Sequence, residues 1–322
     1  MNYAAQDTAR QLENIMIDAN YPAAFIKRTL FMEPLARYTS WKVGGPAERF
    51  FQPLDKTDLI NFLRMLPETE SLFWMGLGSN LLIRDGGISG TVINTRGRLK
   101  AMRMQEQTKI YVEAGVPCAH VARFCCEQDL VGAEFFAGIP GTMGGALAMN
   151  AGAFGGETWA LVDKVYTVNR TGISAVRPRH EYKIGYRSVT ATNQDWFLAT
   201  TLRLKPGDGR AGKEKIRRLL AQRAQTQPTN LPSCGSVFRN PPDDHAARLI
   251  EDCGLKGFSV GSACVSDKHA NFIVNSGGAT AADIEALIEY IKGVVFDRQK
   301  IVLIPEVRIV GEREKPGNHT DG

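Results

Sequence analysis

The chain of 322 residues contains no apolar run near the roughly 20 residues that a membrane-spanning helix needs. Residues 1–20 include acidic side chains and no continuous apolar stretch, so no N-terminal signal peptide is expected. No block of Lys and Arg forms a basic arm, and the net charge of +5 is too small and too evenly spread to indicate nucleic-acid binding. These absences favour a cytoplasmic protein that binds neither membrane nor nucleic acid. A mild positive charge suits small anionic ligands.

The cysteines lack any spacing typical of a metal site. No C-x-x-C pair occurs, and Cys125 and Cys126 are adjacent in the sequence. A disulfide framework is unexpected in a chain of this size with six cysteines. The sequence therefore predicts free thiols in a reducing compartment and no metal ion.

Helical and strand patterns alternate along the chain without a repeat period or a low-complexity tract, which predicts an α+β protein. Asp55 or Thr57 is a candidate cap for the first helix, and Thr280 with Asp283 forms a box-like start for the last one. The expected helices are 56–66, 117–128, 213–225, 245–253 and 280–297. The expected strands are 47–53, 72–77, 90–95, 99–104, 109–114, 161–169, 196–204, 236–239, 261–265, 271–274 and 301–310. Residues 205–209 form a candidate linker, and the tail after Glu312 is polar.

Glycines cluster in two stretches, 76–80 and 138–155. Neither is a Walker A loop, because no Gly-Lys-Ser/Thr occurs, and neither has the spacing of a Rossmann fingerprint. Tight turns alone would explain each stretch. The length and small residues of the second stretch favour a long anionic ligand along backbone amides, near a helix start at which Pro140 suits the first turn.

Six short motifs occur in an order that resembles the UDP-N-acetylenolpyruvoylglucosamine reductase family. They are residues 39–47 (TSWKVGGPA), 76–83 (GLGSNLLI), 138–146 (GIPGTMGGA), 186–188 (YRS), 235–241 (GSVFRNP) and 305–308 (PEVR). Each motif is moderately specific, and six in order over residues 37–308 make coincidence improbable.

The resemblance implies the FAD-binding fold of the vanillyl-alcohol oxidase (PCMH) type, with two α+β subdomains and a smaller α+β substrate domain. The implied ranges are 20–88, to which 301–312 is a candidate to fold back, then 89–205 and 210–300. By the same resemblance, two loops hold FAD chiefly through backbone amides. Their residues are Gly76, Gly78, Ser79, Asn80, Leu81, Gly138, Ile139, Pro140, Gly141, Thr142, Gly144, Gly145 and Ala146.

The family reaction implies roles for three catalytic residues. NADPH reduces FAD and leaves, and the enolpyruvyl sugar nucleotide then receives a hydride and a proton. Arg187 matches the arginine that meets the developing carboxylate charge, and Ser236 the serine that protonates the substrate carbon. Glu306 matches a glutamate that orients the cation or relays protons. Without the resemblance, these residues would read as a solvated arginine, a turn serine and a strand-end carboxylate.

Three further residues are candidates for substrate binding: Tyr186, Arg223 and Asn240. Arg223 reads equally well as the solvated face of its helix. The chain passes directly from Arg187 to the strand expected at 196, without the inserted tyrosine loop of the long form of the family, so it resembles the short form. We expect a monomer.

Two alternatives stay open. A related FAD-linked oxidase often tethers flavin to a histidine near the first Gly-rich loop, but no histidine precedes His120. A non-catalytic FAD-binding or sugar-nucleotide-binding module would explain the loops and leave Arg187, Ser236 and Glu306 without a purpose.

Overall fold

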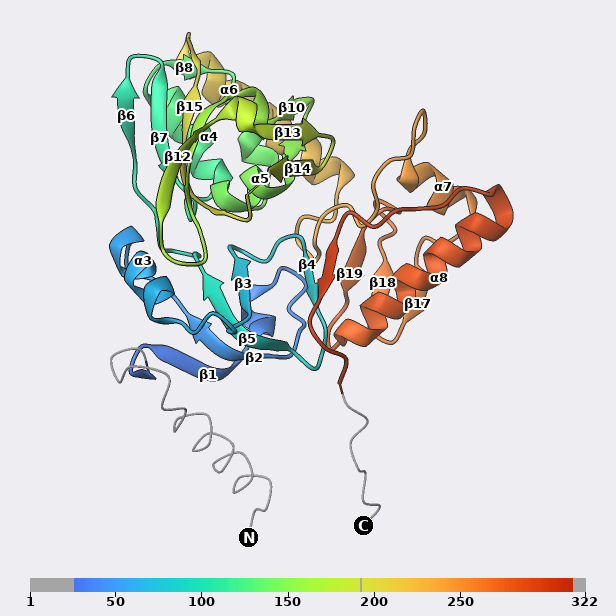
Figure 1. The fold of residues 1–322 in the computed structure, drawn as a ribbon. Helices are drawn as coiled ribbons and strands as arrows, with labels where there is room; N and C mark the ends of the chain where they lie inside the picture. The colour runs from blue at the N-terminus through green and yellow to red at the C-terminus, as the bar shows by residue number, and fades with distance from the viewer. Residues whose placement is uncertain (1–25, 192, 315–322) are drawn as a thin grey trace.

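A computed structural model describes residues 26–191 and 193–314. Residues 1–20, in which no signal peptide is expected, lie outside the described residues. So does the polar tail from residue 315 onward. The described chain forms three groups of elements, each with its own sheet, and they meet around the short strand β4, Leu81–Ile83 (Figure 1).

The first group is a four-stranded mixed sheet with strand order β1-β2-β5-β3. Asp55 is the N-cap of helix α3: its carboxylate accepts the Asp58 N–H at 2.9 Å, so Asp55 is the one of the two candidate caps, Asp55 and Thr57, that caps the helix. This sheet runs past residue 88, because β5 pairs in parallel with both β2 and β3. Its elements are β1 (Thr29–Pro34), η1 (Leu35–Tyr38), β2 (Pro46–Phe51), α3 (Lys56–Met65), β3 (Leu72–Met75) and β5 (Ile88–Asn94).

The second group is a five-stranded antiparallel sheet of order β12-β11-β15-β7-β6, which shares one hydrophobic core with helices α4, α5 and α6 (Figure 1). Its main elements are β6 (Met102–Glu106), β7 (Lys109–Glu113), α4 (Cys118–Glu127), α5 (Met143–Met149), β11 (Val162–Val168), β12 (Ser174–Pro178), β15 (Trp196–Arg203) and α6 (Gly209–Thr226). Helix α6 begins at Gly209 with Asp208 as its N-cap, so the end of the predicted linker 205–209 belongs to the helix. Pro140 was expected in the first turn of α5, but it lies outside that helix, because Thr142 is the N-cap.

Short strands and 3-10 helices connect the main elements of the second group. The sequence did not predict strand β12 or the hairpin of β13 and β14, in which Tyr186 and Arg187 form the turn. The remaining elements are β8 (Leu130–Val131), η2 (Glu134–Gly138), β9 (Gly152–Ala153), β10 (Gly156–Glu157), η3 (Thr158–Ala160), η4 (Arg179–Glu181), β13 (Tyr182–Gly185), β14 (Ser188–Ala191) and β16 (Lys205–Pro206).

The third group packs helices α7 (Ala246–Asp252) and α8 (Ala281–Gln299) against a three-stranded sheet. Its strands are β17 (Ser259–Val260), β18 (Ala263–Val265) and β19 (Ile273–Asn275). The capping box predicted at the start of α8 is confirmed: Thr280 and Asp283 each accept the other's backbone N–H. Trp41 is fully buried in this core and donates its indole N–H to the Ile273 carbonyl at 2.7 Å.

Residues after α8 return to the first group. β20, Arg308–Val310, pairs in parallel with β4. Only these three residues of the predicted strand 301–310 form a strand. The predicted strand 236–239 is wrong: Phe238 makes one isolated bridge to Pro305, since the chain here turns through irregular backbone. No helix within residues 26–191 and 193–314 combines the length and the apolar character of a membrane crossing.

Candidate active site

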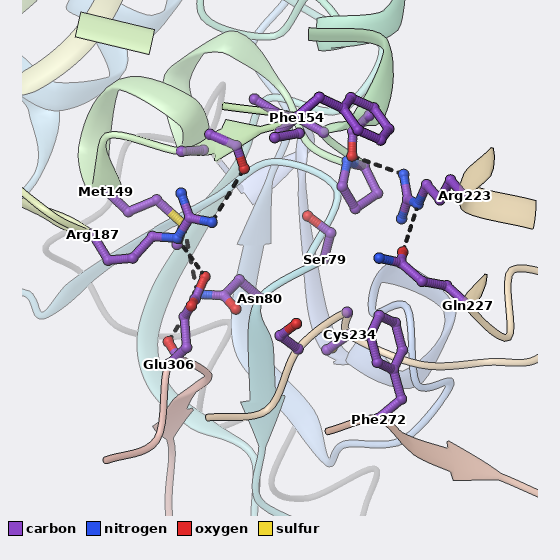
Figure 2. A pocket seen from close by; sticks show the side chains of 18 residues that line it. Ser79, Asn80, Met149, Phe154, Arg187, Arg223, Gln227, Cys234, Phe272 and Glu306 are labelled. Carbon is purple, nitrogen blue, oxygen red and sulfur yellow. Dashed lines mark hydrogen bonds and ion pairs between the residues drawn. The ribbon is translucent and has the colours of Figure 1, made fainter. Parts of the chain in front are cut away.

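Two adjoining cavities lie where the three groups meet. The first has a volume of about 290 Å³ and the second about 340 Å³. They share one wall, built from Ser79, Asn80, Ile139, Met149, Ala151, Arg187 and Glu306. Figure 2 shows the first cavity, with Arg187 and Glu306 on one side and Arg223 and Gln227 on the other.

The first Gly-rich loop presents backbone amides to the second cavity. Within residues 26–191 and 193–314, the N–H groups of Leu77, Gly78, Ser79 and Asn80 have no protein acceptor. Gly78 has φ 61°, and a Cβ there would come within 2.3 Å of the Tyr38 carbonyl oxygen, so only glycine fits. A row of amides without protein acceptors is typical of an anion-binding loop.

The second Gly-rich stretch brings the start of α5 to the same cavity. A Cβ on Gly145 would meet only Thr142 Oγ1, at 3.8 Å, so this side of the helix faces open space. Gly144 instead faces the strand: its N–H donates to the Ala114 carbonyl at 2.8 Å, and a Cβ would lie 3.0 Å from Ala114 Cβ. Gly145 therefore faces the cavity, whereas Gly144 lets the helix pack closely on β7.

The predicted cofactor residues all line cavities, though not the same one. Gly138 and Pro140 line the first cavity, and Gly144 lines a third cavity of about 160 Å³ beside Trp74 and Trp196. The others line the second cavity: Gly76, Gly78, Ser79, Asn80, Leu81, Ile139, Gly141, Thr142, Gly145 and Ala146.

Arg187 and Glu306 form an ion pair on the wall shared by the two cavities. Arg187 Nε lies 2.8 Å from Glu306 Oε1 without hydrogen-bond alignment, and Arg187 Nη2 donates to the Gly152 carbonyl at 3.1 Å. The Glu306 N–H donates to the Val237 carbonyl at 2.7 Å, which holds the backbone that carries the carboxylate. Burial raises the pKa of Glu306, and the positive charges of Arg187 and Arg239 counteract part of that rise.

Ser236 lines the first cavity together with Arg187 and Glu306, so the structure brings the three predicted catalytic residues to one place. Gly235 precedes it with φ 77°, a conformation that favours glycine. Cys234 is buried and donates its thiol to the Leu81 carbonyl at 3.5 Å. Burial raises the pKa of Cys234 to about 12, so the thiol is neutral and ties this segment to the first Gly-rich loop.

Of the three candidate substrate residues, all within the described chain, one lines the first cavity and two do not. Arg223 lines the first cavity, donates to the Gly138 carbonyl at 2.8 Å and to Gln227 Oε1 at 2.9 Å, and burial lowers its pKa (Figure 2). Neither Tyr186 nor Asn240 is among the described residues that line the two cavities. Tyr186 is 51% exposed, and Asn240 Oδ1 accepts the Ala246 N–H at the start of α7.

Sequence reasoning gave no role to Arg239 or Gln227. Arg239 lines the second cavity, and its Nε is buried without a hydrogen-bond partner among the described residues. Both lie beside residues that the motifs did single out, since Arg239 precedes Asn240 and Gln227 is one helical turn after Arg223. The sequence does not show in which direction the Arg239 and Gln227 side chains point, and that direction decides whether they line a cavity.

The second cavity suits an anionic dinucleotide such as FAD. Unpaired amides line it, Gly145 faces it, and the buried donors Arg239 Nε and Trp74 Nε1 have no partner among the described residues. Residues 47–174 match a family model described as an FAD binding domain. Residues 227–310 match the model "UDP-N-acetylenolpyruvoylglucosamine reductase, C-terminal domain".

The UDP-N-acetylenolpyruvoylglucosamine reductase of Methylococcus capsulatus is 64% identical over 282 residues, which are 88% of this chain and 93% of the relative. The chain belongs to the UDP-N-acetylenolpyruvoylglucosamine reductase family. The family member of Legionella pneumophila (strain Lens) is 54% identical over 92% of this chain and 96% of its own length.

A solved structure of the family gives the same result. The enzyme from Thermus caldophilus superposes with a TM-score of 0.75 at 29% identity, covering 88% of this chain and 98% of that chain. The predicted α+β fold of the vanillyl-alcohol oxidase (PCMH) type, with FAD as cofactor, is therefore confirmed.

Proposed function

We propose that Arg187, Ser236 and Glu306 control the charge and the proton in the reduction of an enolpyruvyl sugar nucleotide. The chain is an FAD-dependent oxidoreductase of peptidoglycan precursor synthesis. It reduces UDP-N-acetylglucosamine enolpyruvate to UDP-N-acetylmuramate, with NADPH as electron donor. FAD, when bound, accepts a hydride from NADPH and delivers one to the substrate.

Arg187 is proposed to bind the substrate carboxylate. Hydride addition to one carbon of the enol-ether double bond leaves negative charge on the other carbon and on the adjacent carboxylate. A guanidinium keeps its charge at all relevant pH values and binds carboxylates in two-pronged geometry. Arg187 lies on the wall shared by both cavities, so its charge reaches a substrate in the first cavity.

Ser236 is proposed to give its hydroxyl proton to that second carbon. A hydroxyl is a weak acid in water and works only when it is held at the carbon. The segment before Ser236 is held by the buried Cys234 contact. Glu306 is proposed to orient Arg187, because Glu306 Oε1 lies 2.8 Å from Arg187 Nε.

The observation that carries this proposal is the placement of all three side chains on the first cavity, which shares a wall with the second. Arg223 and Gln227 stand across the first cavity, where they suit the diphosphate of the nucleotide (Figure 2). Tyr186 and Asn240 stay candidates through the family motif alone.

The test is Ser236→Ala, with the two half-reactions followed separately by flavin absorbance. Reduction by NADPH should proceed normally, because it needs no proton from Ser236. Reoxidation by the enolpyruvyl substrate should slow by about 10²–10⁴-fold, the usual contribution of a positioned acid. Substrate affinity should change little.

Ser276→Ala is the matched control, since Ser276 is exposed and outside the described lining of both cavities. If Ser236→Ala slows reduction by NADPH as much as reoxidation, the residue is structural and its assignment is wrong.

We also propose that the enzyme acts in the cytoplasm as a monomer, because its nucleotide substrate and NADPH are both dissolved there. Light scattering during gel filtration measures the mass, and a value of 35.4 kDa is expected. A dimer mass would contradict the monomer.

A further inference from the structure

The second cavity carries more positive than negative charge. The charged side chains among the described residues that line it are Arg187, Arg239, Arg308 and Glu306. Arg187 Nε lies 2.8 Å from Glu306 Oε1, and Arg187 is already assigned to the substrate carboxylate. Two guanidiniums, those of Arg239 and Arg308, remain for an anionic ligand.

Arg239 differs from Arg308 in its surroundings. Arg239 Nε is buried and has no hydrogen-bond partner among the described residues, whereas Arg308 is an exposed residue. A guanidinium cannot shed its charge, so a buried donor without an acceptor is costly unless a ligand supplies one. Arg239 therefore needs an anionic partner from the ligand more than Arg308 does.

The backbone holds Arg239 at the catalytic end of the second cavity. Its N–H donates to the Ile304 carbonyl at 2.9 Å, and the neighbouring Phe238 bridges to Pro305, directly before Glu306. The amides that suit a pyrophosphate run from Leu77 to the start of α5, and of this row of described residues only Asn80 bonds to Glu306. Arg239 is also not among the described residues that line the first cavity, where the substrate carboxylate is proposed to bind.

Two sources of negative charge are available at this end: the Glu306 carboxylate, which Arg239 also affects but which already lies 2.8 Å from Arg187 Nε, and the flavin ring itself. A neutral oxidised ring that accepts a hydride, two electrons and one proton together, becomes an anion unless it takes up a second proton. The charge then lies along the edge that contains N1 and the C2 carbonyl. Protein charges near N1 tune the electronics of a bound flavin.

We propose that Arg239 stabilises the negative charge of the reduced flavin. This deepens the proposed function and rests on it, since FAD must occupy the second cavity. Arg239 acts on the equilibrium between oxidised and reduced cofactor, and thereby favours the first half-reaction with NADPH.

The experiment measures the reduction potential of bound FAD in Arg239→Gln by anaerobic equilibration with a reference dye at saturating FAD. Reduction should become about tenfold less favourable, which for two electrons lowers the potential by about 30 mV. The reduced flavin should also take up its second proton at higher pH, seen as a change in its absorption spectrum. Arg239→Lys, which keeps the charge, should restore most of both properties.

Arg217→Gln removes the same charge from the exposed side of α6 and should leave the potential unchanged. An unchanged potential in Arg239→Gln with normal FAD binding would overturn the proposal. So would weaker FAD binding at an unchanged potential, which would indicate a pyrophosphate contact, or a change confined to the KM of the enolpyruvyl substrate. Wild-type turnover of NADPH with that substrate tests the proposed function independently of Arg239.

Discussion

Glu306 is a carboxylate in an environment that disfavours its charge. Burial raises its pKa even though the guanidiniums of Arg187 and Arg239 act in the opposite direction. A carboxyl group whose pKa rises on folding stabilises the folded state while it is protonated, at pH below its unfolded pKa. That contribution is lost as the pH rises through the folded pKa.

Glu306→Gln should therefore show a pH-dependent difference in stability from the wild type. Gln mimics the protonated carboxyl at every pH, so Tm of the variant minus Tm of the wild type should increase as pH rises from about 4. Differential scanning calorimetry across a pH series measures this difference. A difference that is flat, or that falls with pH, would mean that pairing with Arg187 outweighs burial.

At the scale of elements, helix α5 and the loop before it form one wall of the second cavity. Gly144 and Gly145 are adjacent, but the first faces Ala114 and the second faces open space. A side chain at each position should therefore have a different consequence.

Gly145→Leu should lower the FAD content of the purified protein by about tenfold or more, because the side chain would enter the second cavity while the fold is retained. Absorbance at the flavin band against protein concentration measures the content, and circular dichroism checks the fold. Gly293→Leu, at an exposed glycine of α8 with no atom within 4 Å of a Cβ, is the control. Normal flavin content in Gly145→Leu would show that the ligand lies elsewhere.

Elements with strong local signals were predictable. Asp55 and the Thr280–Asp283 pair mark helix starts through side chains that bond to their own first turn, so the sequence alone contains the information. The hairpin of β13 and β14 was missed, since each strand has only four residues and gives a short periodic signal. The segment 236–239 has a strand-like pattern, but its partner at Pro305 is distant in sequence and makes only one bridge.

The site was predictable in its motifs and less so in its geometry. Arg187, Ser236 and Glu306 follow from short motifs, and the structure brings all three to one cavity. Their meeting depends on the Arg187 turn, with φ 51°, and on the return of the chain to β4. The directions of the Tyr186 and Asn240 side chains depend on local backbone that no motif specifies.

On the scale of the whole molecule, the two cavities share the wall that contains Arg187 and Glu306. With FAD proposed to occupy the second cavity, a hydride donor and a hydride acceptor would both approach it from the first. Both must reach the wall that the two cavities share, beside Arg187 and Glu306, so they compete for the same space.

NADPH and the enolpyruvyl substrate should therefore bind in turn, which gives ping-pong kinetics. Initial rates at several fixed concentrations of one substrate should produce parallel double-reciprocal lines, and excess of either substrate should inhibit competitively with the other. A clean intersecting pattern, as a ternary complex requires, would contradict this.

The pairing of β20 with β4 has a consequence for biosynthesis. Asn80 and Glu306 are in contact, yet 226 residues separate them, so a ribosome must synthesise all three groups of elements before the site can close. A nascent chain that ends within α8 already contains both Gly-rich loops but lacks Glu306 and the strand beside the first of them. Contacts this distant in sequence form slowly. Flavin capture should thus follow synthesis of Glu306 and β20, and the unpaired edge of β4 is the surface that a chaperone would meet in the meantime.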